Sequence, residues 1–253
     1  MYCQLLWWTK MIDLFKIYDD HILTLRDDNF EARYEGRDSW YHASGAGLCM
    51  RKHYYAQIEG FPASDKDSDT MRLFRLGDLV HTDMQDALQI YADENNLDVY
   101  IEKEIIIPRL NVRSFIDAMV LRDAALYDIK TCNDYKWQSI FSKHGSVNGI
   151  QNYMIQLGTY GLYFRDNNIK INKMSLLFYN KNNSRVKELR VPLSYLDTAE
   201  RYWEKVKELF EDGLPPIKEN IDEPGLVPVE NWECNKKYCS FFEVCGGGIK
   251  GMH

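Results

Sequence analysis

The hydrophobic period of the chain changes near residue 96, and this change is the strongest constraint on its fold. Residues 99–107, 112–121 and 124–131 are short, rich in β-forming side chains and separated by turn residues, so they predict three consecutive strands. Before them, residues 70–95 have the spacing of one long helix with a single buried face. The apolar positions of that face are Leu73, Phe74, Gly77, Val80, Met84, Ala87, Leu88 and Tyr91.

Four further helices and a strand hairpin follow from the same patterns. The helices are expected at residues 11–28, 48–58, 149–165 and 194–211, and the hairpin at residues 171–180 and 185–191. Together these elements predict an α/β fold with a central sheet flanked by helices.

The composition is that of an ordinary globular chain, with 253 residues, 45% of them hydrophobic, and a net charge of −7. No run approaches the ~18 apolar residues of a membrane-spanning helix, so we expect a cytoplasmic protein with no membrane partner. Residues 165–190 hold seven basic and two acidic residues, a local surface that could grip phosphates or be only a solvated face. The chain has no G-x-x-x-x-G-K-[ST] loop, which argues against a nucleotide-driven motor.

Two of the expected strands carry charges in a pattern that indicates chemistry. Alternate residues of a strand share a face, so Asp128 and Lys130 point the same way while Ile129 points into the core. If the strand with Asp117 is the neighbour, two carboxylates and one ammonium converge. Buried like charges are costly unless a hard divalent cation compensates them. The alternative is that these charges lie on an edge strand and face solvent.

Three polar residues on the expected helices could complete such a site. His81 lies on or near the buried face of the long helix, where it is either a satisfied core histidine or a nitrogen ligand of the metal. Gln156 and Tyr160 are four residues apart, so they share a helix face. Glu102 and Glu104 are weaker candidates, because an exposed strand face explains them equally well.

The cysteines predict a second metal centre. Of six cysteines, Cys234, Cys239 and Cys245 fall within the last twenty residues, close enough to share one metal centre. A fourth thiolate would come from Cys49, at the start of a helix, or from Cys132. Four thiolates suit zinc or a 4Fe–4S cluster, and free thiols packed as small hydrophobic groups are the alternative.

In their order along the chain, His81, Asp117, Asp128-Ile129-Lys130 and Gln156-x-x-x-Tyr160 resemble the PD-(D/E)XK nuclease superfamily, in particular its RecB-like branch. The four cysteines make the chain similar to the iron–sulfur members, which include CRISPR-associated exonucleases and the nuclease domains of AddB-type recombination enzymes. The resemblance spans roughly residues 44–245. Ser114 stands where the family often has glycine, and the spacing C-x4-C-x5-C departs from the commoner form.

This resemblance implies a restriction-endonuclease-like fold and a role for each matching residue. His81, Asp117, Asp128 and the Ile129 carbonyl would hold Mg²⁺ or Mn²⁺, and Lys130 would be the catalytic lysine. The helix motif of Gln156 and Tyr160 would support the site and contact DNA. Cys49 would be the fourth ligand of a 4Fe–4S cluster, with zinc as the alternative.

The sequence therefore predicts a metal-dependent DNA exonuclease that acts on DNA ends or single strands in recombination, repair or DNA processing, beside a separate helicase or recombination partner. Two alternatives are a catalytically silent DNA-end-binding or scaffolding subunit, and a metal-cluster protein in which redox sensing matters. We expect a helical region at residues 1–69, a nuclease core at 70–213, and a linker with a cysteine-rich tail at 214–253 that packs back on the first region.

Overall fold

The computed structural model describes residues 13–34, 40–57, 67–211, 213, 233–236 and 238–245. The chain forms two compact units, residues 1–37 with 66–76 and residues 38–65 with 77–253. The expected segments 1–69, 70–213 and 214–253 stay a prediction, and most of the expected linker lies outside the described residues.

The first unit contains helix α1 (Leu14–Tyr34) and the first turns of helix α3 (Ser68–Asn95). Helix α3 begins where Asp67 Oδ1 accepts a hydrogen bond from the Thr70 N–H at 2.8 Å, as an N-cap side chain does. Arg72 on α3 forms ion pairs with Asp19 on α1 and with Asp69. These contacts tie the two helices of the unit together.

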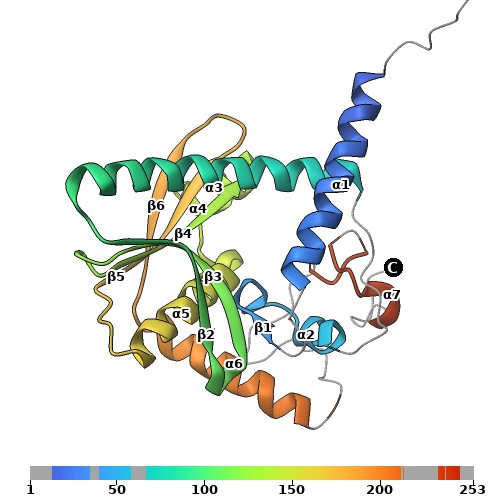
Figure 1. Ribbon diagram of the computed structural model, residues 1–253. Helices are drawn as coiled ribbons and strands as arrows, with labels where there is room; N and C mark the ends of the chain where they lie inside the picture. Colours follow the sequence, from blue (N-terminus) through green and yellow to red (C-terminus); the bar gives the residue numbers. More distant parts are fainter. Residues whose placement is uncertain are drawn as a thin grey trace, which may run out of the picture. The chain divides into compact units, whose positions relative to one another are not determined.

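The second unit is built on a six-stranded mixed sheet (Figure 1). Its strands are β1 (Tyr41–His42), β2 (Val99–Ile107), β3 (Val112–Val120), β4 (Ala125–Cys132), β5 (Lys173–Asn180) and β6 (Val186–Val191). The short 3-10 helices are η1 (Ala43–Gly45), η2 (Pro108–Leu110) and η3 (Asn148–Ile150).

Strand β3 has two edges that are paired very differently. Along one edge β2 pairs with it antiparallel over nearly its full length. The other edge is shared, because β4 pairs antiparallel with residues 118–120 and β1 pairs parallel with residues 112–113. Between them, within the described part of the chain, residues 114–117 have no strand partner on that edge. Strand β4 instead follows β5 in parallel over eight residue pairs, and β5 pairs antiparallel with β6. The sheet therefore opens between β3 and β4.

Helix α5 (Gln151–Asp166) returns the chain from β4 to β5 and is almost wholly buried, because it packs between the sheet and helix α6 (Tyr195–Glu211) (Figure 1). The two helices approach closely at Gly158, where a Cβ atom would lie 2.2 Å from the Tyr195 carbonyl oxygen. Trp203 on α6 is fully buried and donates its Nε1–H to Thr159 Oγ1 at 2.9 Å.

Helix α2 (Met50–Gln57) is fixed to α6 through His53. The His53 Nε2 atom lies 3.0 Å from the Tyr202 hydroxyl and 3.0 Å from the Gly45 carbonyl. Burial lowers the His53 pKa to about 4, so this imidazole is neutral at physiological pH. The Tyr202 hydroxyl donates to the Leu48 carbonyl at 3.1 Å, which holds the segment that leads into Cys49.

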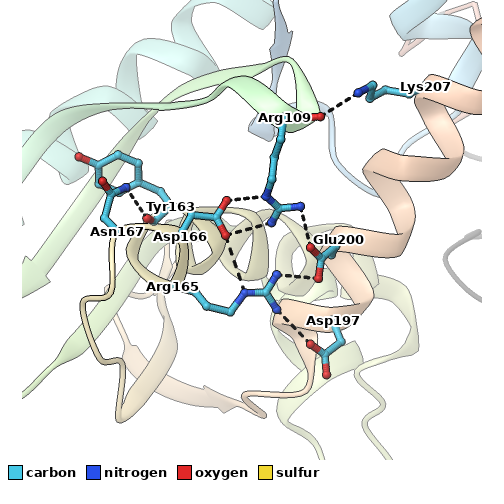
Figure 2. A network of polar contacts seen from close by, with 8 residues as sticks. All are labelled: Arg109, Tyr163, Arg165, Asp166, Asn167, Asp197, Glu200 and Lys207. Carbon is cyan, nitrogen blue, oxygen red and sulfur yellow. Dashed lines mark hydrogen bonds and ion pairs between the residues drawn. The ribbon is translucent and has the colours of Figure 1, made fainter.

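A surface network of ion pairs sets the position of α6 relative to α5 and η2 (Figure 2). Arg109 Nε lies 2.6 Å from Asp166 Oδ2, and Arg109 Nη1 lies 2.6 Å from Glu200 Oε1. Arg165 Nη2 lies 2.6 Å from the other oxygen of Glu200. Exposed ion pairs of this kind contribute less than about 1 kcal/mol each to the free energy of folding. The network therefore serves mainly to orient α6 against α5 and η2.

The basic segment of residues 165–190 is partly neutralised within the fold. Arg165 pairs with Asp197 and Glu200, and Lys173 Nζ lies 2.5 Å from Glu188 Oε1. Those two basic residues are thus engaged by carboxylates rather than presented as uncompensated charges.

The sheet flanked by helices confirms the predicted fold class, and the predicted helices and strands lie within a few residues of the observed ones. Strand β1, helix α4 (Asp134–Phe141) and helix α7 (Phe242–Cys245) were not predicted, because each is very short. The predicted buried face of α3 is wrong at half of its positions. Gln85 and Ala92 are the buried residues of α3. The predicted positions Gly77, Val80, Met84 and Leu88 are half-buried, and Leu73, Phe74, Ala87 and Tyr91 are exposed. No helix among the described residues is long and apolar enough to cross a membrane.

Substitution of Gly158 by alanine should destabilise the second unit by about 1–3 kcal/mol, because the new methyl group would overlap backbone atoms of α6. The matched control is Gly149→Ala, where the nearest atom to an added Cβ is the flexible Lys136 Nζ at 3.7 Å. Denaturant unfolding of both variants checks this. Equal midpoints would contradict the close approach of the two helices.

Candidate functional site

Asp117 and Asp128 lie on neighbouring strands at the point where the sheet opens. The β3–β4 ladder ends at the pair Ala118–Tyr127, and one further step would place Asp117 opposite Asp128. Positions opposite each other on paired strands share a face. Asp128 is fully buried and the Asp117 side chain is 12% exposed. Two carboxylates therefore face the same opening with little water around them.

The oxygen Oδ2 of Asp117 holds the two strands together where their ladder stops. It accepts the Ile129 N–H at 2.6 Å and lies 3.6 Å from Nδ1 of His81 on α3. The N–H and C=O of one strand residue point to the same side. The carbonyl of Ile129 is thus directed toward the gap between β3 and β4, where sequence analysis expects a metal ligand.

Lys130 and the α5 residues Gln156 and Tyr160 form a chain of hydrogen bonds that starts at Asp128. Lys130 Nζ lies 2.8 Å from Asp128 Oδ2 and donates to Gln156 Oε1 at 3.1 Å. Gln156 Nε2 donates to Asp128 Oδ1 at 3.2 Å and to the Tyr160 hydroxyl at 2.6 Å. The buried Ser114 also hydrogen bonds with Tyr160. Gln156 and Tyr160 are themselves buried, so they hold Asp128 and Lys130 from behind.

Gln85 and Tyr153, which the sequence analysis did not single out, also support the site. Gln85, one helical turn after His81, donates its Nε2 to the Asp117 carbonyl at 3.1 Å and to Glu102 Oε1 at 2.7 Å. Glu102 has a left-handed φ of 46° and lies on β2 beside Asp117, where the regular β2–β3 pairing is interrupted. Tyr153 on α5 lies under the Lys130 ammonium, which is 5.1 Å from its ring centroid. The four-residue spacing from His81 was the available signal for Gln85.

Burial dominates the electrostatics of the site. It raises the pKa of both Asp117 and Asp128, and the nearby Lys130 only partly offsets the effect. Burial also works against the Lys130 ammonium, but Asp128 and Asp117 outweigh it and raise the Lys130 pKa. The His81 pKa is lowered by burial and by Lys130, so the imidazole is neutral and its nitrogen can act as a ligand.

The donor set suits a hard divalent cation. Asp128 Oδ2 is buried and accepts no well-formed hydrogen bond from any residue that the structure describes, even though the Lys130 ammonium is close. Carboxylate and carbonyl oxygens with one imidazole are ligands that Mg²⁺ and Mn²⁺ accept. In the described residues no three His, Cys, Asp or Glu side chains form a group that could hold an ion as they stand.

The four predicted cluster cysteines line one pocket in the second unit. Cys49 at the start of α2 and Cys234, Cys239 and Cys245 line a small cavity of about 20 Å³. Cys132 is not among the residues that line it; its side chain is buried at the end of β4. The fold thus brings together residues nearly two hundred positions apart. Cys3 lies outside the described residues.

Glu233 joins the two walls of this cysteine pocket. Its side chain is 3% exposed, accepts the Cys49 N–H at 2.5 Å and lies 3.3 Å from Lys52 Nζ. Burial, followed by Glu233, raises the Cys49 pKa to about 11, so this thiol stays protonated unless a cation binds. Arg51 Nη1 donates to the Cys245 sulfur at 3.4 Å and supplies positive charge to the pocket.

No protein-family model and no curated protein matches this chain. Among solved structures, SSO0001 is similar over 91% of this chain and 97% of its own, with a TM-score of 0.53 and 15% identity. The alkaline exonuclease LHK-Exo from Laribacter hongkongensis matches 73% of this chain and 94% of its own, with a TM-score of 0.46 and 14% identity. At these identities the similarity to SSO0001 supports a shared fold, and the weaker match carries no argument. The six-stranded mixed sheet flanked by helices is consistent with a restriction-endonuclease-like fold.

Without metal at pH 8, the free energy of unfolding of Asp117→Asn should be about 1–3 kcal/mol higher than that of the wild type. The folded-state pKa of Asp117 is raised to about 6, so its ionised form costs stability once the pH exceeds that value. The difference should shrink as the pH falls from 6 toward 4, where the wild-type carboxyl becomes protonated in the folded state. Mg²⁺ should then stabilise the wild type and not the variant.

Denaturant unfolding at several pH values, with chelator and with Mg²⁺, measures this difference. A variant that is less stable at pH 8, or one that gains as much from Mg²⁺ as the wild type, would contradict this account of the site.

Proposed function

We propose that this chain is a Mg²⁺- or Mn²⁺-dependent deoxyribonuclease that hydrolyses phosphodiester bonds by attack of water. The observation that carries the proposal is the pair of buried carboxylates, Asp117 and Asp128, that face one opening between two strands beside the Lys130 ammonium. Burying two carboxylates at one place costs several kcal/mol of folding free energy, so a contribution to stability does not explain why they are there.

In this proposal His81, Asp117, Asp128 and the Ile129 carbonyl would hold the ion. When bound, such an ion activates water and neutralises charge on a phosphate. Lys130, kept in place by Asp128 and Gln156, orients the attacking water and stabilises negative charge that develops on the phosphoryl oxygens. Gln85 fixes the backbone of Asp117, and Tyr160 fixes Gln156.

The finer assignment rests on the ordered motifs of the PD-(D/E)XK superfamily and its RecB-like branch. It makes the chain an exonuclease that acts on DNA ends or single strands in the cytoplasm, in recombination, repair or DNA processing, beside a separate motor protein.

Lys130→Gln should reduce cleavage of end-labelled DNA by about 100-fold or more, because the ammonium is lost while an amide can still bond Asp128 and Gln156. Binding of the same DNA should be nearly unchanged. Lys170→Ala, at an exposed lysine outside the site, is the matched control and should cleave like the wild type. The assay is a time course with Mg²⁺, Mn²⁺ or chelator.

A wild-type protein that binds DNA ends but never cleaves them would favour the catalytically silent subunit instead. Cleavage by Lys130→Gln at the wild-type rate would rule out the proposed role of that lysine.

We further propose that Cys49, Cys234, Cys239 and Cys245 hold a 4Fe–4S cluster with a structural role. Their four thiols line one cavity, and the choice of a 4Fe–4S cluster over zinc rests on the resemblance to the iron–sulfur nucleases. Arg51 and Lys52, which also line this cavity, would offset the negative charge of four thiolates.

Protein purified without oxygen should contain about four iron atoms per chain, with absorbance near 400 nm that dithionite bleaches. Cys234→Ser should lose that iron, whereas Cys132→Ser should retain it because Cys132 is not among the residues lining the cysteine pocket. Stoichiometric zinc in place of iron would overturn the cluster assignment and leave the cysteine pocket as a zinc site.

A further inference from the structure

Two lysines share one aromatic ring beside the proposed active site. The Lys130 ammonium lies 5.1 Å from the Tyr153 ring centroid, and the Lys136 ammonium lies 5.8 Å from the same centroid. Lys130 is the residue bonded to Asp128 within the site. Lys136 is on α4 and is half-exposed, so positive charge extends from the buried site to the adjacent surface.

Hydrogen bonds fix the position of Lys136 at the start of α4. Its ammonium donates to the Gly149 carbonyl at 2.5 Å, and its backbone N–H caps α4 on Asn133 Oδ1 at 2.8 Å. The start of α4 is also tied to the end of β5, since Asn180 Nδ2 donates to Asp134 Oδ1 at 2.6 Å. The Asp134 N–H in turn donates to Asn182 Oδ1 at 2.9 Å. These bonds hold the first turn of α4 in one conformation.

Tyr135, the residue before Lys136, is presented outward from this same turn. Its side chain is 84% exposed, whereas Trp137 on the same helix is 7% exposed and packs its ring 4.8 Å from that of Phe141. Core packing therefore explains Trp137 and does not explain Tyr135. An exposed aromatic ring on a rigid turn next to a lysine is suited to stack on an unpaired base while the lysine binds a phosphate.

We propose that the first turn of α4 grips a single DNA strand as it passes the active site, with Lys136 at a backbone phosphate and Tyr135 stacked on a base. This inference rests on the proposed nuclease function and adds to it a preference for unpaired DNA. A duplex would keep its bases stacked and leave Tyr135 without a partner, so the grip discriminates between the two kinds of substrate.

The test uses Lys136→Gln, which removes the charge but keeps a donor for the Gly149 carbonyl, together with Tyr135→Ala and Tyr135→Phe. Each is made in the Asp117→Asn background, so that a fluorescein-labelled single strand is bound but not cut. Lys136→Gln should lower the slope of log affinity against log salt by about 0.7, the value for one phosphate contact on a single strand.

Tyr135→Ala should weaken binding about tenfold and abolish the quenching of a 2-aminopurine base, whereas Tyr135→Phe should keep both because the ring remains. Lys170→Ala and Tyr91→Ala, at exposed positions outside this turn, are the matched controls and should bind like the parent. Duplex DNA should lose affinity with Lys136→Gln but not with Tyr135→Ala.

Unchanged affinity and salt dependence in both Lys136→Gln and Tyr135→Ala would overturn the inference, as would an equal loss in the two control variants. The α4 variants are also made in the catalytically active wild-type chain. If the wild type cleaves DNA and these variants have an unchanged KM, only this inference fails. If the wild type neither binds nor cleaves DNA, the proposed function fails, and this inference fails with it.

Discussion

The structure depends on one costly arrangement, the burial of Asp117 and Asp128 on neighbouring strands with the Lys130 ammonium nearby to offset part of their charge. Desolvation raises the pKa of both carboxyls, so each would be easier to bury as an uncharged side chain. The surrounding fold sustains the arrangement through hydrogen bonds, chiefly from the Ile129 N–H and from Gln156. Such a local concentration of unfavourable charge is typical of a site that handles cations.

The opening in the sheet and the chemistry of the site have the same cause. The backbone pairing of β3 with β4 stops at Ala118, so residue 117 has no backbone partner on β4. The Asp117 carboxylate accepts the Ile129 N–H instead. Helix α5 lies behind this opening, fixed by the close approach at Gly158, so Gln156 reaches both Asp128 and Lys130. The contacts with α5 therefore fix the positions of Asp128 and Lys130.

The alternation of Asp128 and Lys130, and the four-residue spacing of Gln156 and Tyr160, were enough to predict that each pair shares one face, and each pair is hydrogen bonded in the structure. Both rules are local, and local periodicity survives folding. The buried face of α3 was predicted only in part, because apolar spacing does not tell how much of a helix its sheet will cover. The four-residue spacing from His81 was a local signal for Gln85 but not for its partners, and no local pattern pointed to Glu233. The roles of Gln85 and Glu233 depend on contacts with Asp117 and Cys49, the latter 184 residues away, which only the folded chain brings together.

The central claim is that Asp117 and Asp128 bind one divalent cation between them. Crystals of the protein grown with Mn²⁺, and measured for anomalous scattering, test it most directly. The account predicts a single strong peak about 2.0–2.4 Å from a carboxylate oxygen of each aspartate, with the His81 imidazole beside it. A well-ordered site without that peak, or with Lys130 still bonded to Asp128 and manganese bound only elsewhere, would contradict it.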